Sequence, residues 1–149
     1  VGDMVRMGEL LVTLNSVRWD EGSQFLRLLA PEPGELWLVA DVTLENESEQ
    51  CEAISSFLMF KLYDQELYSR DTAFAGTKGS LDGQLAPGRK MRGELAFSVD
   101  GGQDRWELVF ESQIFGFGHA IFIITLDDLQ YATATPTPTP TLVGGVRCV

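Results

Sequence analysis

The sequence predicts an all-β fold: a sandwich of two antiparallel sheets with about seven or eight short strands, followed by an extended Thr/Pro tail. Three observations predict it. Apolar residues recur with period two between turn residues, and no segment keeps an apolar stripe of period 3.6 over three helical turns. No internal repeat is evident, which disfavours a propeller or a solenoid.

The length and composition suit one core plus a tail. Of the 149 residues, 44% are hydrophobic and 22% are charged, as in ordinary globular proteins. We expect residues 1–130 to form the sandwich, because that length supports a single core. Residues 131–149 form the predicted tail, which ends in a segment able to dock as a strand.

The first half of the chain contains the clearest strands. Residues 10–15 alternate apolar and mixed positions, and residues 36–45 place five apolar side chains on one face. Between them, residues 19–34 are irregular. Their apolar residues at 25–29 could form one helical turn before Pro31 and Pro33 end it.

The second half repeats short apolar runs between turns. The predicted turns lie at residues 64–66, 86–88 and 101–102, where Gly, Pro or Asp favours chain reversal. The glycine- and serine-rich residues 72–83 are predicted to be a loop. The predicted strands are residues 54–63, 67–68, 91–99, 105–111 and 119–126.

Three segments resemble a known bacterial family. They are the opening residues 1–14, the central Leu-Trp-Leu-Val-Ala-Asp-Val-Thr-Leu-Glu-Asn of residues 36–46, and Leu-Ala-Pro-Gly-Arg-Lys-Met-Arg-Gly-Glu-Leu-Ala-Phe of residues 85–97. Together they resemble the telokin-like, immunoglobulin-like domain of unknown function found in bacterial secreted proteins and lipoproteins. The resemblance covers about residues 1–126 and implies an extracytoplasmic immunoglobulin-like sandwich that acts as a non-catalytic accessory or interaction module. It supplies no catalytic residues, and the C-terminal tail departs from its usual pattern.

Charge and hydropathy exclude two classes of partner. The net charge is −11, which disfavours nucleic acid and anionic membrane surfaces, and the dense basic group Arg89, Lys90 and Arg92 fits a solvated strand. No apolar run is longer than the five residues of 120–124, which is too short to span a bilayer. The sequence begins at Val1, so a removed signal peptide would leave no trace in it.

No catalytic, cofactor or metal motif is evident, so we predict that the chain is not an enzyme. The single histidine, His119, lacks a G-x-S-x-G partner motif, and Gly116 to Gly118 lack the context of a dinucleotide loop. Residues 41–52 carry an acidic run whose spacing does not follow a calcium-binding loop, and a solvated strand end is expected there.

The two cysteines and the tail suggest an exported protein. Cys51 and Cys148 match no zinc or redox spacing, so a disulfide is predicted, either within the chain or between chains, with two free thiols as the alternative.

Thr/Pro tracts favour an extended polyproline II spacer and are typical of glycosylated or wall-spanning segments. Asn46 begins a formal glycosylation sequon. The candidate O-glycosylation sites are Thr133, Thr135, Thr137, Thr139 and Thr141.

The last predicted strand is apolar on both faces. Phe122, Ile124 and Leu126 fall on one face, and Ile121 and Ile123 fall on the other. Either the tail or residues 25–29 cover this second face, or another subunit does. The interface candidates are Ile114, Phe115, Phe117, Ile121, Ile123, Leu142, Val143 and Val146.

These features favour a non-catalytic extracellular structural or interaction subunit that assembles on the cell surface through its tail, as a filament, a pilus-like structure or an envelope assembly. Its partners would be copies of itself or another envelope protein. Seven residues of polyproline II reach about 22 Å at ~3.1 Å each, enough to deliver residues 142–149 to a neighbouring sheet edge. The alternative is a monomeric accessory module that binds a protein or glycan and is tethered by the Thr/Pro linker.

Overall fold

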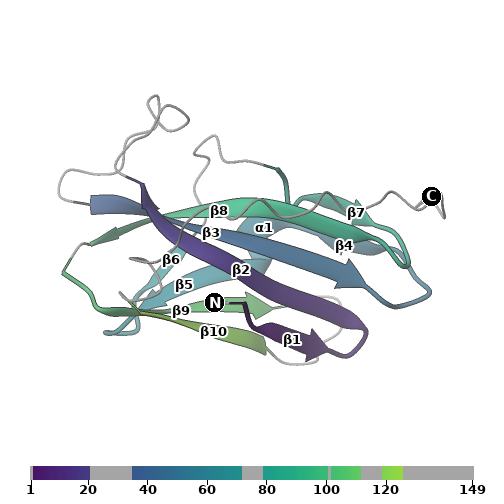
Figure 1. The fold of residues 1–149 in the computed structure, drawn as a ribbon, viewed down its shortest axis with the longest axis horizontal. Coiled ribbons are helices and arrows are strands. Elements are labelled where there is room, and N and C mark those ends of the chain that lie inside the picture. Colours follow the sequence, from purple (N-terminus) through teal and green to yellow (C-terminus); the bar gives the residue numbers. More distant parts are fainter. Residues whose placement is uncertain (1, 21–34, 72–78, 101, 112–118, 126–149) are drawn as a thin grey trace.

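Two four-stranded antiparallel sheets form the two layers of the fold (Figure 1). The computed structural model describes residues 2–20, 35–71, 79–100, 102–111 and 119–125. The first sheet has the order β1-β2-β3-β8 and the second has the order β10-β9-β5-β6. The first sheet contains β1 (Met4–Met7), β2 (Leu10–Asp20), β3 (Glu35–Asn46) and β8 (Lys90–Asp100). The second contains β5 (Phe60–Asp64), β6 (Ser69–Asp71), β9 (Arg105–Glu111) and β10 (His119–Thr125).

A small third sheet closes one end of the molecule. It pairs β4 (Glu52–Ile54) with β7 (Gly83–Leu85), and β4 is followed by the single-turn helix α1 (Ser56–Met59). The predicted all-β sandwich is thereby confirmed. The described part of the chain has ten strands rather than seven or eight. The strands that the sequence analysis missed are β1, which has four residues, and β4 and β7, which have three each and are too short to show an alternating pattern.

The predicted continuous strand over residues 54–63 is wrong, because α1 interrupts it. The Ser55 hydroxyl accepts a hydrogen bond from the backbone N–H of Leu58 at 3.4 Å and so caps the turn. The Ser56 N–H and hydroxyl both donate to the carboxylate of Asp82, at 2.8 Å for the N–H. Of the helix residues, Met59 is buried while Phe57 and Leu58 are exposed.

The predicted turn after β5 is confirmed, although the return strand starts two residues later than expected. The Asp64 carboxylate accepts hydrogen bonds from the backbone N–H groups of Glu66 and Tyr68, at 2.9 and 3.0 Å. Leu67 adopts a left-handed conformation with φ of 69°. The turn therefore extends through Tyr68, and β6 begins at Ser69. The helical turn expected at residues 25–29 lies outside the described residues.

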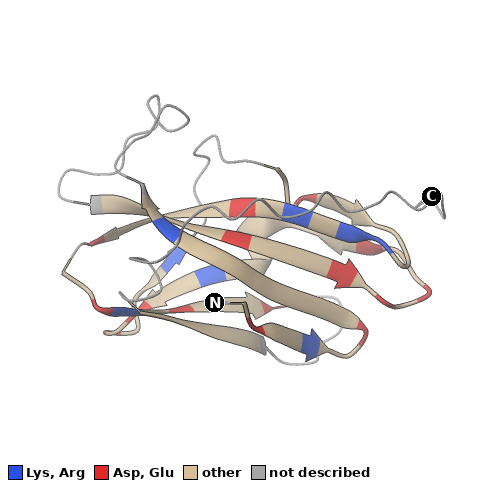
Figure 2. Ribbon diagram, in the orientation of Figure 1, with Lys and Arg blue, Asp and Glu red and all other residues tan. Residues whose placement is uncertain are grey.

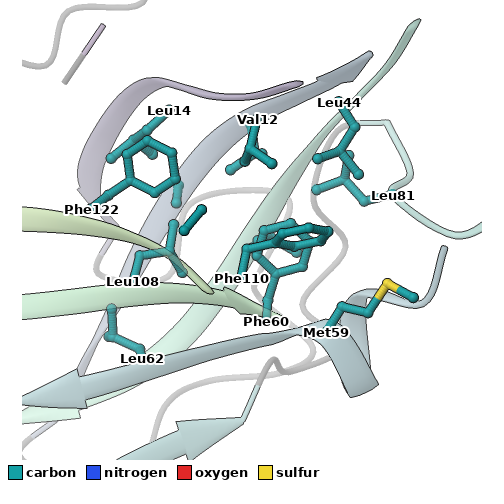
Figure 3. Packing of buried hydrophobic residues seen from close by; sticks show 14 of the residues in the cluster. Val12, Leu14, Leu44, Met59, Phe60, Leu62, Leu81, Leu108, Phe110 and Phe122 are labelled. Carbon is teal, nitrogen blue, oxygen red and sulfur yellow. The ribbon is translucent and has the colours of Figure 1, made fainter. Parts of the chain in front are cut away.

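The core fills the space between the two large sheets (Figure 3). In β2 and β3, alternate side chains such as Val12, Leu14 and Leu44 point inward, as the sequence pattern predicts. They meet side chains of the second sheet, including Phe60 and Phe110, whose ring centres are 4.8 Å apart. Residues on the two inner faces thus make one shared core, which holds the strands that carry the outer surfaces.

The outer face of the first sheet carries an ordered row of charges. Arg92 donates to Asp41 through Nε at 2.9 Å and through Nη2 at 2.5 Å, and Asn15 donates to the same carboxylate at 3.1 Å. Arg18 pairs with Glu94 in the same row. Figure 2 shows these charges of both signs on neighbouring strands β2, β3 and β8. The face is therefore held by partnered charges rather than by free ones.

Candidate functional site: an end cavity and an exposed apolar face

A cavity of about 320 Å³ opens at the end of the sandwich where β1 turns into β2. The β1–β2 turn and the segment after β3 are tied together there, since the Glu47 N–H donates to the Glu9 carbonyl at 2.8 Å. Six side chains that line the cavity matter for its chemistry: Met7, Glu9, Leu10, Asn46, Ser48 and Glu52.

Asn46 builds one wall of this cavity and is only 1% exposed. Its side-chain amide donates to the Gln50 carbonyl at 2.7 Å and to the Leu85 carbonyl at 2.9 Å. Its Oδ1 accepts from both the N–H and the hydroxyl of Ser48, at 2.9 and 2.7 Å. Asn46 therefore joins the end of β3, the following loop and β7 into one rigid frame.

The backbone of Asn46 extends the same frame to the turn before β8. Its N–H donates to the Arg89 carbonyl at 3.0 Å, and its carbonyl accepts from the Gly88 N–H at 2.7 Å. Gly88 has a φ of 73°, which confirms the predicted Ala-Pro-Gly turn. With both amide hydrogens already donated in a buried position, the sequon asparagine cannot accept a sugar while the chain is folded.

Glu52 is the most unusual group in the cavity. Its side chain is 4% exposed, although a carboxylate is rarely so buried without a partner. Within the described ranges its carboxylate forms no hydrogen bond or ion pair. Burial raises the pKa of Glu52 above its usual value, and the negative charge of Glu9 raises it further. The cavity therefore contains a carboxylate whose charge no described residue compensates.

The acidic run of residues 41–52 does not form one cluster. Asp41 pairs with Arg92, Glu47 pairs with Arg6, and Glu45 lies 3.9 Å from Lys90. In the part of the chain that the structure describes, no group of three or more His, Cys, Asp or Glu side chains is placed to hold a metal ion. The expected solvated strand end fits most of the run, but it is wrong for Glu52, which faces the interior.

Sequence reasoning missed Glu52 because it treated the run as a single solvated segment. A signal was present in the alternation of Glu52, Ala53 and Ile54, which are buried, exposed and buried in β4. Residues two positions apart in a strand point to the same side, so Glu52 points inward as Ile54 does. The strand itself is only three residues long, so this alternation carries little weight until the β4–β7 pairing is known.

The second candidate site is the outward face of β10. Phe122 and Ile124 point into the core, whereas Ile121 and Ile123 are 51% and 50% exposed. In the β9–β10 register, Ile121 lies opposite the buried Val109, and Ile123 lies opposite Glu107. β1 lies beside β10 along this side of the sandwich, and the outward side chains of β10 are exposed.

The remaining predicted site residues are His119, the two cysteines and a set of residues outside the described ranges. His119 is the first residue of β10 and lies opposite Glu111 in the register. Cys51 is half-buried immediately before Glu52 and is disulfide-bonded, so the free-thiol alternative is wrong for it. Cys148 lies outside the described residues, and the choice between a bond within one chain and a bond between chains stays a prediction. The other predicted residues outside the described ranges are Ile114, Phe115, Phe117, Thr133, Thr135, Thr137, Thr139, Thr141, Leu142, Val143 and Val146.

Comparison with known proteins identifies a family and a fold. A family profile described as a domain of unknown function (DUF4352) matches residues 1–120. No match was found among curated proteins. Along the described residues, no helix has the length and apolar character to cross a bilayer.

Three solved structures show the breadth of the fold. A Bacillus subtilis candidate lipoprotein, ycdA, is 18% identical with a TM-score of 0.71, and the match covers 87% of this chain but only 40% of ycdA. The yjhA protein of Bacillus subtilis is 20% identical with a TM-score of 0.66, over 81% of this chain and 95% of its own. An uncharacterized β-sandwich protein of Clostridium difficile is 12% identical with a TM-score of 0.57, over 84% of this chain and 91% of its own. The predicted bacterial β-sandwich of unknown function is confirmed, whereas its telokin-like character stays a prediction.

Proposed function

Because this chain belongs to the DUF4352 family of domains of unknown function, we propose a role that follows from its surface: a non-catalytic interaction subunit outside the cytoplasm, which assembles with copies of itself. The observation that carries the proposal is the outward apolar face of β10. Ile121 and Ile123 are each about half exposed on the same face of one strand, whereas the other isoleucines that the structure describes, Ile54 and Ile124, are buried.

The surroundings of this face suit a protein partner. Lys61 and Glu107 flank the apolar pair, because Lys61 lies opposite Val109 in the register and Glu107 lies opposite Ile123. An apolar centre with a polar rim is the common anatomy of protein interfaces. β10 itself carries no acidic side chain, although the whole chain has a net charge of −11.

The occupant that we propose is the C-terminal segment, residues 142–149, of another copy. This segment supplies Leu142, Val143 and Val146 for apolar contact, and it carries Arg147 and no acidic residue. A positive, apolar peptide is complementary to an acidic body with an uncharged apolar strand. The Thr/Pro tract before it would hold the segment away from its own domain, and a bond between Cys148 and Cys51 would lock the contact.

The location outside the cytoplasm is supported by three observations. The Bacillus subtilis relative ycdA is described as a candidate lipoprotein. The Thr/Pro tail is typical of extracellular segments, and a disulfide is stable mainly in oxidising compartments. A non-catalytic role is supported by the sequence, whose single histidine lacks a G-x-S-x-G partner motif.

Intact mass of the natively purified chain under denaturing conditions, with and without reductant, tests this proposal first. A ladder of multiples that collapses on reduction would support assembly through interchain Cys51–Cys148 bonds. A single mass two hydrogens below the reduced value would place the disulfide within one chain and count against tail exchange.

A double variant tests the face itself. We expect Ile121→Ser with Ile123→Ser to lower the oligomer fraction in size-exclusion chromatography with light scattering, as deletion of residues 132–149 should. Leu58→Ser is the matched control, because Leu58 is 52% exposed but lies on α1. Equal oligomer fractions in all variants would reject the proposal.

The end cavity favours a second candidate function. A monomeric accessory module with a small-ligand site would explain a rigid cavity with one uncompensated carboxylate. A compact monomer with a protease-sensitive tail would favour this role over assembly.

A further inference from the structure

The end cavity has the features of a built ligand site. Its volume of about 320 Å³ falls at the lower end of the range for small-molecule sites, roughly 300–1,000 Å³. Its wall is preformed, because Asn46 holds the three surrounding segments by side-chain and backbone hydrogen bonds. A ligand would therefore bind without first having to order the cavity.

The negative charges in the cavity favour a positively charged ligand. Glu52 is buried without a hydrogen bond or ion pair among the described residues, and Glu9, the other acid that lines the cavity, adds a second negative charge. A buried ionised carboxylate costs free energy unless a cation or donor satisfies it. The group that removes this cost is a positively charged hydrogen-bond donor.

We propose that this cavity binds the ammonium group of a small organic amine, with Glu52 as its buried counter-charge and Glu9 at its side. Three N–H donors of an ammonium group suit this set of acceptors, since two carboxylates surround it from the β1–β2 turn and from β4. Met7 and Leu10 provide an apolar wall for the carbon chain of the ligand.

A metal ion fits the same residues less well. Calcium needs six to eight oxygen ligands as a rule, and the cavity offers few free ones. Asn46 Oδ1 already accepts two hydrogen bonds from Ser48, and the Ser48 hydroxyl is itself hydrogen-bonded within the loop. The two apolar side chains on the wall would also leave a dehydrated metal ion without ligands on that side.

Isothermal titration calorimetry with the full chain at about pH 7 tests the proposal, using n-hexylammonium as the probe. The controls are 1-hexanol, which has the same carbon chain without the charge, and calcium chloride. We expect hexylammonium to bind at least about tenfold more tightly than hexanol, and calcium not to compete. Amide chemical shifts of Gly8, Ser48 and Glu52 would locate the bound probe.

The matched variants are Glu52→Gln and Glu66→Gln. Glu52→Gln keeps the shape of the side chain and removes its charge, so we expect the affinity for hexylammonium to fall at least about tenfold. Glu66 is an exposed acid in the turn after β5, and its substitution should change nothing. Thermal unfolding of both variants checks that each one folds.

Three results would overturn the proposal. Equal affinity for hexanol and hexylammonium would mean that the cavity binds only apolar chains. Calcium binding that is lost in Glu52→Gln would make it a metal site. An absence of binding by any of the three probes would reject a ligand site. Because Ile121 and Ile123 do not line the cavity, hexylammonium binding by their double serine variant would separate this result from any failure of assembly.

Discussion

Asp41 on the outer face of the first sheet and Glu52 in the end cavity are two shielded carboxylates with opposite environments. Burial alone would raise the pKa of Asp41, but the hydrogen bonds from Arg92 and Asn15 and the charges of Arg92 and Arg18 lower it below its usual value. Burial and the charge of Glu9 raise the pKa of Glu52. Asp41 thus stabilises the fold through its partners, whereas Glu52 costs stability and needs another reason to be there.

The largest expected effect comes from the frame around Glu52 rather than from Glu52 itself. Asn46→Ala removes an amide that is hydrogen-bonded on every side and leaves the carbonyls of Gln50 and Leu85 without their donor. We expect a loss of about 3 kcal/mol in the free energy of unfolding, measured by chemical denaturation. A loss below ~1 kcal/mol would show that water replaces the amide and that the cavity wall is not rigid.

A smaller loss is expected when Asp41 loses its partner. Arg92→Met keeps most of the aliphatic packing and removes both hydrogen bonds to the carboxylate. Since both side chains are partly exposed, we expect a loss of ~1–2 kcal/mol and a rise in the pKa of Asp41, followed by NMR titration. If the pKa of Asp41 stays low in this variant, Asn15 and Arg18 suffice to hold it and the comparison with Glu52 weakens.

The smallest change, and one of opposite sign, is expected for Glu52→Gln. The variant removes a desolvated charge that has no partner in the described structure, so at about pH 7 we expect it to be more stable by on the order of 1 kcal/mol. Thermal unfolding measures this directly. A clear loss of stability would mean that Glu52 has a structural partner, and it would argue against a ligand site.

The two acids also predict opposite pH dependences. The pKa of Asp41 is lowered in the folded state, so its contribution to stability is present above its unfolded pKa and is lost as the pH falls through the folded value. The pKa of Glu52 is raised, so the stability linked to its proton is present below its unfolded pKa and is lost as the pH rises through the folded value. The stability gap between Glu52→Gln and the parent chain should therefore close in acid.

The strands that the sequence predicted well are those with one clear inward face. In β3 and β8, alternating residues such as Leu38, Val42 and Phe97 share a buried face across paired strands, so period two alone places them. The same rule fails for residues 54–63, because their conformation depends on a hydrogen bond from the Ser56 N–H to Asp82, which lies in a segment distant in the sequence. Local propensity contains no information about that contact.

The candidate sites divide in the same way. The outward position of Ile121 and Ile123 follows from alternation along β10, and it was predicted. The end cavity was not, because it exists only where the β1–β2 turn, the loop after Asn46 and β4 meet. Long-range pairing of short segments builds it, and such pairing has no periodic signal in the sequence.

The buried sequon has a practical consequence for producing this protein. A secretory cell that attaches sugars to nascent chains would meet Asn46 while the chain is still unfolded and its amide is still in water. A glycan added at that moment would stand where Gln50 and Leu85 must later accept their hydrogen bonds. Folding and glycosylation therefore compete for one nitrogen atom, and an expression host without N-glycosylation avoids the conflict.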